Sequence, residues 1–171
     1  RAYPSFKASQ VMEVKVEVNT VNVVKELKRM SAKQKASVTK ALNKVSNMAI
    51  FMIDKRTKKG LLPDGGKMIP YAKSTVKRRK KKGRQTGFVD LEDSGQMFRS
   101  LTYDIKGLKS SLFFRGQDQN KKASYHDFFG VGKKKTIRPF FSIGNKEEDK
   151  IRQEFTKTYF KAMKIWVKEK T

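Results

Sequence analysis

The chain has 171 residues, of which 37% are hydrophobic, so it is long enough for one hydrophobic core and too short for two. Its 41 Lys and Arg against 16 Asp and Glu give a formal net charge of +25, which predicts attraction to polyanions or acidic protein surfaces. The absence of cysteine excludes disulfides, thiolate metal sites and cysteine nucleophiles, and it fits a reducing compartment. No apolar run approaches the roughly 20 residues of a membrane span, and no signal-peptide pattern opens the chain, so we expect no membrane partner.

The first third of the chain is predicted to contain an arm, a strand and a long helix. Residues 1–10 show no periodicity, and we expect a flexible arm there. Apolar and charged residues alternate over Val11–Val18, the pattern of a half-buried strand, and a short helix is predicted over Asn22–Met30. Apolar residues then recur at helical spacing over Ser31–Lys59. This long amphipathic helix is the best-defined element of the sequence.

The next segment combines loops with two short helices. Turn residues, which include an Asp-Gly-Gly run, predict a loop over Leu61–Pro70. A short and very basic helix is predicted over Tyr71–Lys82. Asp93 or Ser94 can cap a second short helix that carries Met97.

The last part is predicted to begin with a β-hairpin and to end in a helix. Strands around Tyr103–Ile105 and Leu112–Phe114 flank a turn at Gly107–Ser110. The polar residues 116–122 predict a mobile loop. The remaining predicted elements are a short helix at Ala123–Phe129, a charged loop tip at Lys133–Lys135, a segment at Ile137–Ile143, and a C-terminal amphipathic helix that is capped by Asn145 with Glu148 and reaches Trp166.

Strands and helices do not alternate strictly along the chain, and no internal repeat is present. We therefore predict an α+β fold, in which a small, mostly antiparallel sheet packs against the long helix of the N-terminal half and a C-terminal helix. We expect residues 11–171 to form a single domain behind the flexible arm.

The sequence does not point to an enzyme. A catalytic histidine needs a nucleophile or a carboxylate beside it, and the single histidine, His126, has only Asp127 next to it. Sequence neighbours on a helix point apart, so we expect His126 to have a packing or hydrogen-bonding role. With no second His and no Cys, we expect no metal site, and the Gly-Gly-Lys near residue 66 lacks the spacing of a phosphate-binding loop, so we expect no cofactor.

The acidic residues before the second short helix could in principle bind a cation. Asp90, Glu92 and Asp93 do not have the spacing of a calcium loop. We expect them to cap the helix and to pair with nearby Lys or Arg.

The strongest local signal is a run of cations, Lys77, Arg78, Arg79, Lys80, Lys81, Lys82 and Arg84. Clustered cations displace counterions from phosphates, which predicts salt-sensitive, sequence-nonspecific contact with nucleic acid. A contact with an acidic protein, a nuclear-localisation signal and a solvated basic face are the alternatives. No RNP, KH or zinc-finger pattern accompanies the run, so sequence-specific readout is not expected.

Several short motifs follow the long helix in a fixed order: Tyr-x-x-x-Thr at Tyr71–Thr75, an acidic lead into Ser-Gly-Gln-Met-x-x-Ser-Leu at Leu91–Leu101, Ala-x-x-His-x-x-x-Gly at Ala123–Gly130, and Arg-Pro-Phe-Phe at Arg138–Phe141. In this order they resemble the tail-completion and virion-morphogenesis proteins of tailed bacteriophages, the neck components that join tail to head, over roughly Ser31–Trp166. The residues that match the family's motifs are Leu91, Gly95, Met97, Leu101, Ala123, His126, Phe129, Gly130, Arg138, Pro139 and Phe140. One extra residue precedes Gly130 in this chain.

The resemblance implies a non-enzymatic virion subunit, assembled in the host cytoplasm. It would form a homomeric ring, a hexamer or a dodecamer, at the head–tail junction. The implied partners are a connector or adaptor protein, a tail-tube or tail-terminator protein, and genomic DNA that passes through the lumen. The loops at 61–70 and 116–122 are candidates for the contacts, and the candidate interface residues are Leu61, Leu62, Asp64, His126, Arg138, Pro139 and Phe140.

Two points stay open at the level of sequence. The segment Arg138–Phe141 could lock a packed connector in place, or it could be an edge strand held on the core. The main alternative function is a sequence-nonspecific nucleic-acid-binding protein that uses the run Lys77–Arg84.

Overall fold

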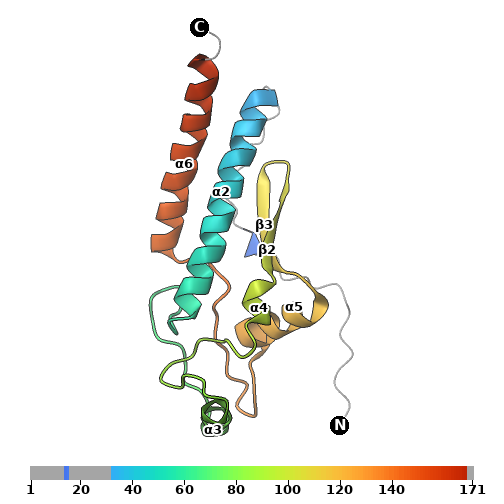
Figure 1. Cartoon of the computed structure of the whole chain (residues 1–171), viewed down its shortest axis with the longest axis vertical. Helices are drawn as coiled ribbons and strands as arrows, with labels where there is room; N and C mark the ends of the chain where they lie inside the picture. The colour runs from blue at the N-terminus through green and yellow to red at the C-terminus, as the bar shows by residue number, and fades with distance from the viewer. Residues whose placement is uncertain (1–13, 16–31, 169–171) are drawn as a thin grey trace.

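Two long helices and a small sheet lie side by side in one half of the molecule, and short helices and loops form the other half (Figure 1). The computed structural model describes residues 14–15 and 32–168. The predicted arm at 1–10, most of the predicted first strand and the predicted helix at 22–30 lie outside the described residues. The α+β fold that the sequence predicts is confirmed.

Helix α2 (Ala32–Thr57) is the central element of the fold. Its buried apolar residues recur every three or four positions and are Val38, Ala41, Val45, Ala49 and Ile53. Gly60 ends the helix in the left-handed conformation (φ +73°), and the next amide donates a hydrogen bond back to the Arg56 carbonyl. A Cβ at Gly60 would come within 3.1 Å of Val89 O, so the chain passes close to its neighbour here.

Helix α6 (Asn145–Lys168) packs along α2 (Figure 1). Its first turn begins at Gly144, whose carbonyl accepts the amides of Glu147 and Glu148, each at 2.9 Å. Glu147 Oε2 in turn accepts the Gly144 amide at 3.0 Å. The predicted cap at Asn145 with Glu148 is therefore wrong by one residue. The backbone of Gly144 and the side chain of Glu147 cap the N-terminus of this helix instead.

Strands β2 (Leu101–Lys106) and β3 (Lys109–Phe114) form the predicted hairpin. Their antiparallel register joins Leu101 to Phe114 and Lys106 to Lys109. Strand β1 (Val14–Lys15) pairs antiparallel with the other edge of β3, so the strand order is β1-β3-β2. One face of the hairpin packs on α2, which lies between the sheet and α6 (Figure 1).

The other half of the molecule holds α3 (Lys73–Lys81), α4 (Gln96–Arg99), α5 (Gln117–Ser124) and the π-helical turn η1 (Tyr125–Phe129). The predicted loop at 116–122 is wrong, because these residues form most of α5. The polar composition of α5 suggested a loop, but the helix is anchored at its end by Ala123, which is fully buried. The extra residue before Gly130 coincides with η1, where the chain takes one wider turn.

The segment predicted at Ile137–Ile143 runs through the hydrophobic core. Phe140 and Phe141 are 0% and 1% exposed. The Phe140 ring meets Phe98 of α4 edge-on at 5.8 Å between centroids, and the Phe141 ring lies 4.8 Å from Phe114 of β3. These rings join the short helices to the sheet in one core cluster. Within residues 14–15 and 32–168, no helix has the length and apolarity to span a membrane.

Candidate functional site

The sequence motifs meet below the sheet in a network of buried and partly buried polar side chains, which we call the junction. Its members are Arg56, Tyr71, Arg79, Asp90, Asp127 and Arg138. They come from α2, α3, η1 and the segments between the short helices, so the junction joins parts of the chain that are far apart in sequence.

Arg79 is the centre of one half of the junction. It lies on α3, in the middle of the basic run, yet it is only 4% exposed. Its guanidinium donates to Asp90 Oδ2 at 2.7 Å, to the Gln85 carbonyl at 2.9 Å and to the Glu92 carbonyl at 2.8 Å. These three bonds hold the chain after α3 against the helix.

Tyr71 and Asp90 complete this half. The Tyr71 hydroxyl donates to Asp90 Oδ1 at 2.9 Å and accepts the Leu91 amide at 3.1 Å. Burial, together with the Asp90 carboxylate, raises the pKa of Tyr71 to about 12. Burial alone would raise the pKa of Asp90, but hydrogen bonds from Gln85, the Glu92 amide and Tyr71, with the charge of Arg79, hold it below its usual value. Asp90 therefore stays ionised and paired.

Arg138 packs on the same tyrosine ring. Its guanidinium lies 5.7 Å from the Tyr71 ring centroid and donates to the carbonyls of Ile69 and Pro70 at 2.8 and 3.0 Å. The Arg138 amide also donates to the His126 carbonyl at 2.7 Å. Arg138 thus links the loop before α3 to the segment after η1.

Asp127 and Arg56 anchor the buried phenylalanines. Asp127 Oδ1 accepts the amides of Phe140 and Phe141 at 2.7 and 2.9 Å. Arg56 donates to the carbonyls of Phe140 and Ser142 and pairs with Glu147. Burial raises the pKa of Asp127, although the two amides and the charge of Arg56 oppose this. Arg56 and Asp127 thus provide partners for the carbonyls of Phe140 and Ser142 and for the amides of Phe140 and Phe141.

A pocket of about 330 Å³ opens beside the junction, between α3 and the residues after η1. Arg78, His126 and Thr136 are among its lining residues. Burial, with the charge of Arg138, lowers the pKa of His126 to about 4, so the imidazole is neutral at pH 7. Its Nδ1 has no hydrogen-bond partner within the described part of the chain.

Within the described residues, no carboxylate is hydrogen-bonded to His126 Nδ1. The carboxylate next to His126 in sequence, Asp127, is bonded to backbone amides instead. Among residues 14–15 and 32–168, no cluster of His, Asp or Glu is suited to a metal ion. Asp90 pairs with Arg79, and Asp93 pairs with Lys82 and Arg84, as the sequence predicted. The predicted cap of α4 by Asp93 or Ser94 is wrong, because the N-cap residue is Gly95, at which no side-chain cap hydrogen bond forms.

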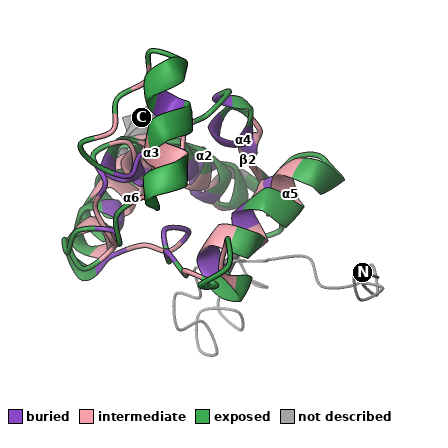
Figure 2. Cartoon of the chain, turned by 90° about the horizontal axis from the view of Figure 1, so that it is seen from below, coloured by how far each residue is buried: buried purple, intermediate pink, exposed green. Residues whose placement is uncertain are grey.

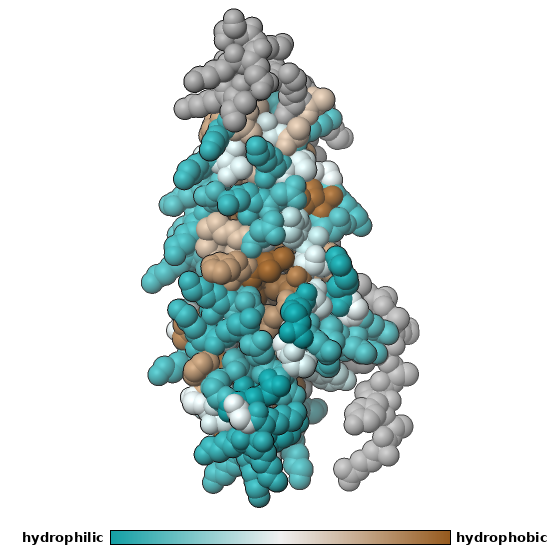
Figure 3. Space-filling view, in the orientation of Figure 1, coloured by the Kyte–Doolittle hydropathy of each residue, from teal (hydrophilic) through white to brown (hydrophobic). Residues whose placement is uncertain are grey.

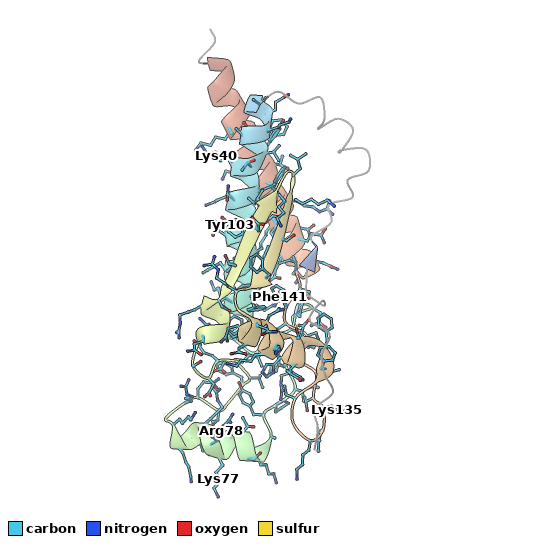
Figure 4. All side chains as sticks on the ribbon, turned by 90° about the vertical axis from the view of Figure 1, so that its right-hand side faces the viewer. Lys40, Lys77, Arg78, Tyr103, Lys135 and Phe141 are labelled. Atoms are coloured by element: carbon cyan, nitrogen blue, oxygen red, sulfur yellow. The ribbon has the colours of Figure 1, made fainter. Side chains whose placement is uncertain are left out.

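The exposed cations lie on the far side of α3, and we call them, with a neighbouring turn, the basic surface. It comprises Lys73, Lys77, Arg78, Lys80 and Lys81 of α3 and Lys133, Lys134 and Lys135 of the turn, all exposed. Figure 2 shows α3 as exposed over most of its surface with one buried band. Lys77 and Lys135 lie at the same end of the molecule, opposite Lys40 (Figure 4).

The predicted cation set therefore divides. Lys77, Arg78, Lys80 and Lys81 are exposed, and within the described residues no ion pair joins them to a carboxylate. Lys82 and Arg84 are within 3.5 Å of Asp93, and Arg79 is buried. Arg79 has to be removed from the predicted contact residues, because its donors are used inside the chain.

The predicted interface set divides in the same way. Asp64 and Pro139 are exposed, Leu61, Leu62 and His126 are partly buried, and Arg138 and Phe140 are 4% and 0% exposed. Arg138 and Phe140 are part of the junction and the core, so their side chains are not available to a neighbour. Of the two roles left open for Arg138–Phe141, attachment to the core is the one observed, although no strand forms there.

Sequence reasoning missed an aromatic patch on η1 and beside it. The patch comprises Tyr125, Phe128, Phe129 and Ile137, which are 43–57% exposed. The Tyr125 and Phe129 rings meet edge-on at 6.0 Å between centroids. No helical periodicity could have placed these residues, because the π-helical turn changes which side chains face outward.

Comparison of the chain with models of protein families, with curated proteins and with solved structures finds no match.

Proposed function

We propose that the chain is a structural virion protein, a tail-completion or neck component that forms a ring joining a phage tail to the head connector. The observation that carries the proposal is the ordered motif set from Tyr71 to Phe141. The structure adds that motif residues far apart in sequence meet in the junction, where they hold backbone segments together. Their use for architecture rather than for a reaction favours a structural protein.

The aromatic patch is the best candidate for the contact between neighbouring subunits. Large exposed apolar side chains that cluster mark interaction sites, and aromatic residues are enriched in protein interfaces. Phe128 is 57% exposed, and Pro139, from the predicted interface set, is exposed on the segment that follows Ile137. A closed ring needs two different, complementary surfaces on each subunit, and this patch would be one of them.

The net charge sets a condition on such a ring. Copies that each carry +25 repel one another, so apolar contacts must be supported by salt or by an anionic partner. At about 0.1 M salt, charges more than roughly 10 Å apart are largely screened. We therefore expect rings to form more readily at high salt, or with an acidic connector or tail protein.

Mass photometry of the purified chain over a salt series tests this proposal. The expected species is a hexamer or a dodecamer that becomes more populated as salt rises, and Phe128→Glu should return it to monomer. Phe51→Glu is the matched control, because Phe51 is similarly exposed, at 60%, but lies on α2 outside the patch. Electron microscopy with the tail and connector proteins supplies the second readout. A chain that stays monomeric at every salt concentration and never enters particles would overturn the proposal.

A further inference from the structure

The basic surface has two separate parts that flank one pocket. One part is the outer face of α3, and the other is the turn Gly132–Lys135. Arg78 of α3 and Gly132 and Thr136 of the turn all line the pocket between them. Cations therefore stand on both sides of this pocket, whose lining also includes Leu91, Val131 and Asp93. The Asp93 carboxylate is paired with Lys82 and Arg84. The linear run Lys77–Arg84 does not reveal this arrangement.

The helical phase of α3 separates its cations from its structural residues. Thr75, Val76 and Arg79 face inward, whereas Lys77 and Lys81, one turn apart, face solvent. The outer face contains no apolar residue, and Figure 3 shows this end of the molecule as hydrophilic. The ammonium groups of neighbouring lysines on this face repel one another, and a bound anion would relieve that repulsion.

The turn is ordered by its own backbone. Val131 and Thr136 exchange two hydrogen bonds of 3.0 Å, and the Lys135 amide donates to Gly132 O at 3.1 Å. This short closed loop holds Lys133, Lys134 and Lys135 at its tip. The lysines are thus presented by a fixed element rather than by a long flexible segment.

We infer that the basic surface binds the phosphodiester backbone of nucleic acid, independently of ring formation. Protein–protein interfaces are depleted in lysine and enriched in aromatic residues, whereas nucleic-acid interfaces are rich in both lysine and arginine. The basic surface has eight cations and no aromatic residue, so it fits phosphates better than an acidic protein. Without aromatic side chains for base stacking, affinity should follow the phosphates and not the base sequence.

Fluorescence anisotropy with a labelled short duplex and the full chain tests the inference. Two triple variants each remove one part of the surface: Lys77→Gln/Lys80→Gln/Lys81→Gln and Lys133→Gln/Lys134→Gln/Lys135→Gln. The matched control, Lys35→Gln/Lys40→Gln/Lys44→Gln, removes the same charge from exposed positions of α2 at the other end of the molecule (Figure 4).

Each phosphate contact contributes about 5-fold in affinity near physiological salt, so each basic-surface variant should weaken binding by roughly 100-fold. The slope of log affinity against log salt should fall by about 1 for each contacting lysine. The control should change both quantities far less. A single strand of unrelated sequence should also bind, with a shallower salt slope than the duplex.

Three outcomes would overturn the inference. Equal losses in the control variant would show that binding follows the total charge of the chain. Unchanged binding in both basic-surface variants would exclude this surface. If polyglutamate displaced the labelled duplex at a lower concentration of negative charge than unlabelled duplex does, the surface would be assigned to an acidic protein instead. The binding should be measured under conditions where mass photometry shows monomers. The result then does not depend on whether the proposed ring forms.

Discussion

Two adjacent arginines on α3 show how differently the junction and the basic surface use the same charge. Arg79 is 4% exposed and donates to one carboxylate and two carbonyls, whereas Arg78 is exposed and has no ion pair among the described residues. A single step of about 100° along the helix separates the two environments. A run of cations in a sequence is therefore not one surface, and its members have to be assigned one at a time.

The choice of residue follows the same division. The buried cations of the junction are all arginines, Arg56, Arg79 and Arg138, and each donates to two or more backbone or side-chain oxygens. Seven of the eight cations of the basic surface are lysines. The planar guanidinium can satisfy several fixed acceptors at once, whereas an ammonium is a strongly hydrated point charge. Arginine is thus used here for architecture and lysine for the surface.

The largest effect is expected when Arg79 is removed. Arg79→Ala would leave the Asp90 carboxylate and two carbonyls without their donor in a buried site. Loss of one partner of a buried ion pair costs about 3–5 kcal/mol, so the free energy of unfolding should fall by about that amount in urea denaturation. Arg79→Lys should recover only part of the loss, because an ammonium cannot reach all three acceptors in the same geometry. A stability change below about 1 kcal/mol in Arg79→Ala would contradict the assignment of Arg79 to the junction.

The next effect concerns pH and His126. Folding lowers the pKa of this imidazole from 6.5 to about 4, so its neutral form is favoured in the folded chain. The contribution to stability is complete above pH 6.5 and is lost as the pH falls toward 4. The lowering corresponds to about 3 kcal/mol at most. Unfolding free energies measured between pH 7 and 4 should therefore fall more steeply in the native chain than in His126→Gln, and equal slopes would show that His126 does not titrate in this way.

A smaller effect is expected at the glycine that lets the lysine turn close. Gly130 has φ +77° and ψ 153°, a conformation that is open almost only to glycine, and a Cβ there would overlap the Lys135 carbonyl. Gly130→Ala should cost about 2–3 kcal/mol and should also weaken polyanion binding through the displaced turn. Gly132→Ala is the matched control, since Gly132 also has positive φ but a Cβ there meets no atom within 4 Å. Its cost should be nearer 1 kcal/mol, and equal losses in the two variants would show that the close approach to Lys135 is not what matters.

In this chain the sequence predicts the positions of helices and strands better than it predicts which side chains are buried. Periodicity identified α2 to within two residues of each end, and alternation with turn residues identified the hairpin. The same reasoning placed Arg79, Arg138 and Phe140 on surfaces, because charge and motif order say nothing of which segments meet. For Arg79 a signal was present, since it falls on the same helical face as Thr75 and Val76. For Arg138 and Phe140 there was none, since their burial depends on α2 and the loop before α3, both distant in the chain.

The smallest effect on stability is expected at Arg78, the neighbour of Arg79. Arg78→Ala removes an exposed side chain that has no ion pair among the described residues, so the free energy of unfolding should change by less than about 0.5 kcal/mol. The same substitution should weaken duplex binding by about 5-fold and lower the salt slope by about 1, because one phosphate contact is lost. Arg79→Ala, measured below its unfolding temperature, would affect binding only through the position of α3.

If Arg78→Ala destabilised the fold as much as Arg79→Ala, the division between junction and basic surface would fail, because both cations would then be structural. If Arg78→Ala changed neither stability nor binding, the basic surface would have to lie on the lysines alone, with Arg78 outside it.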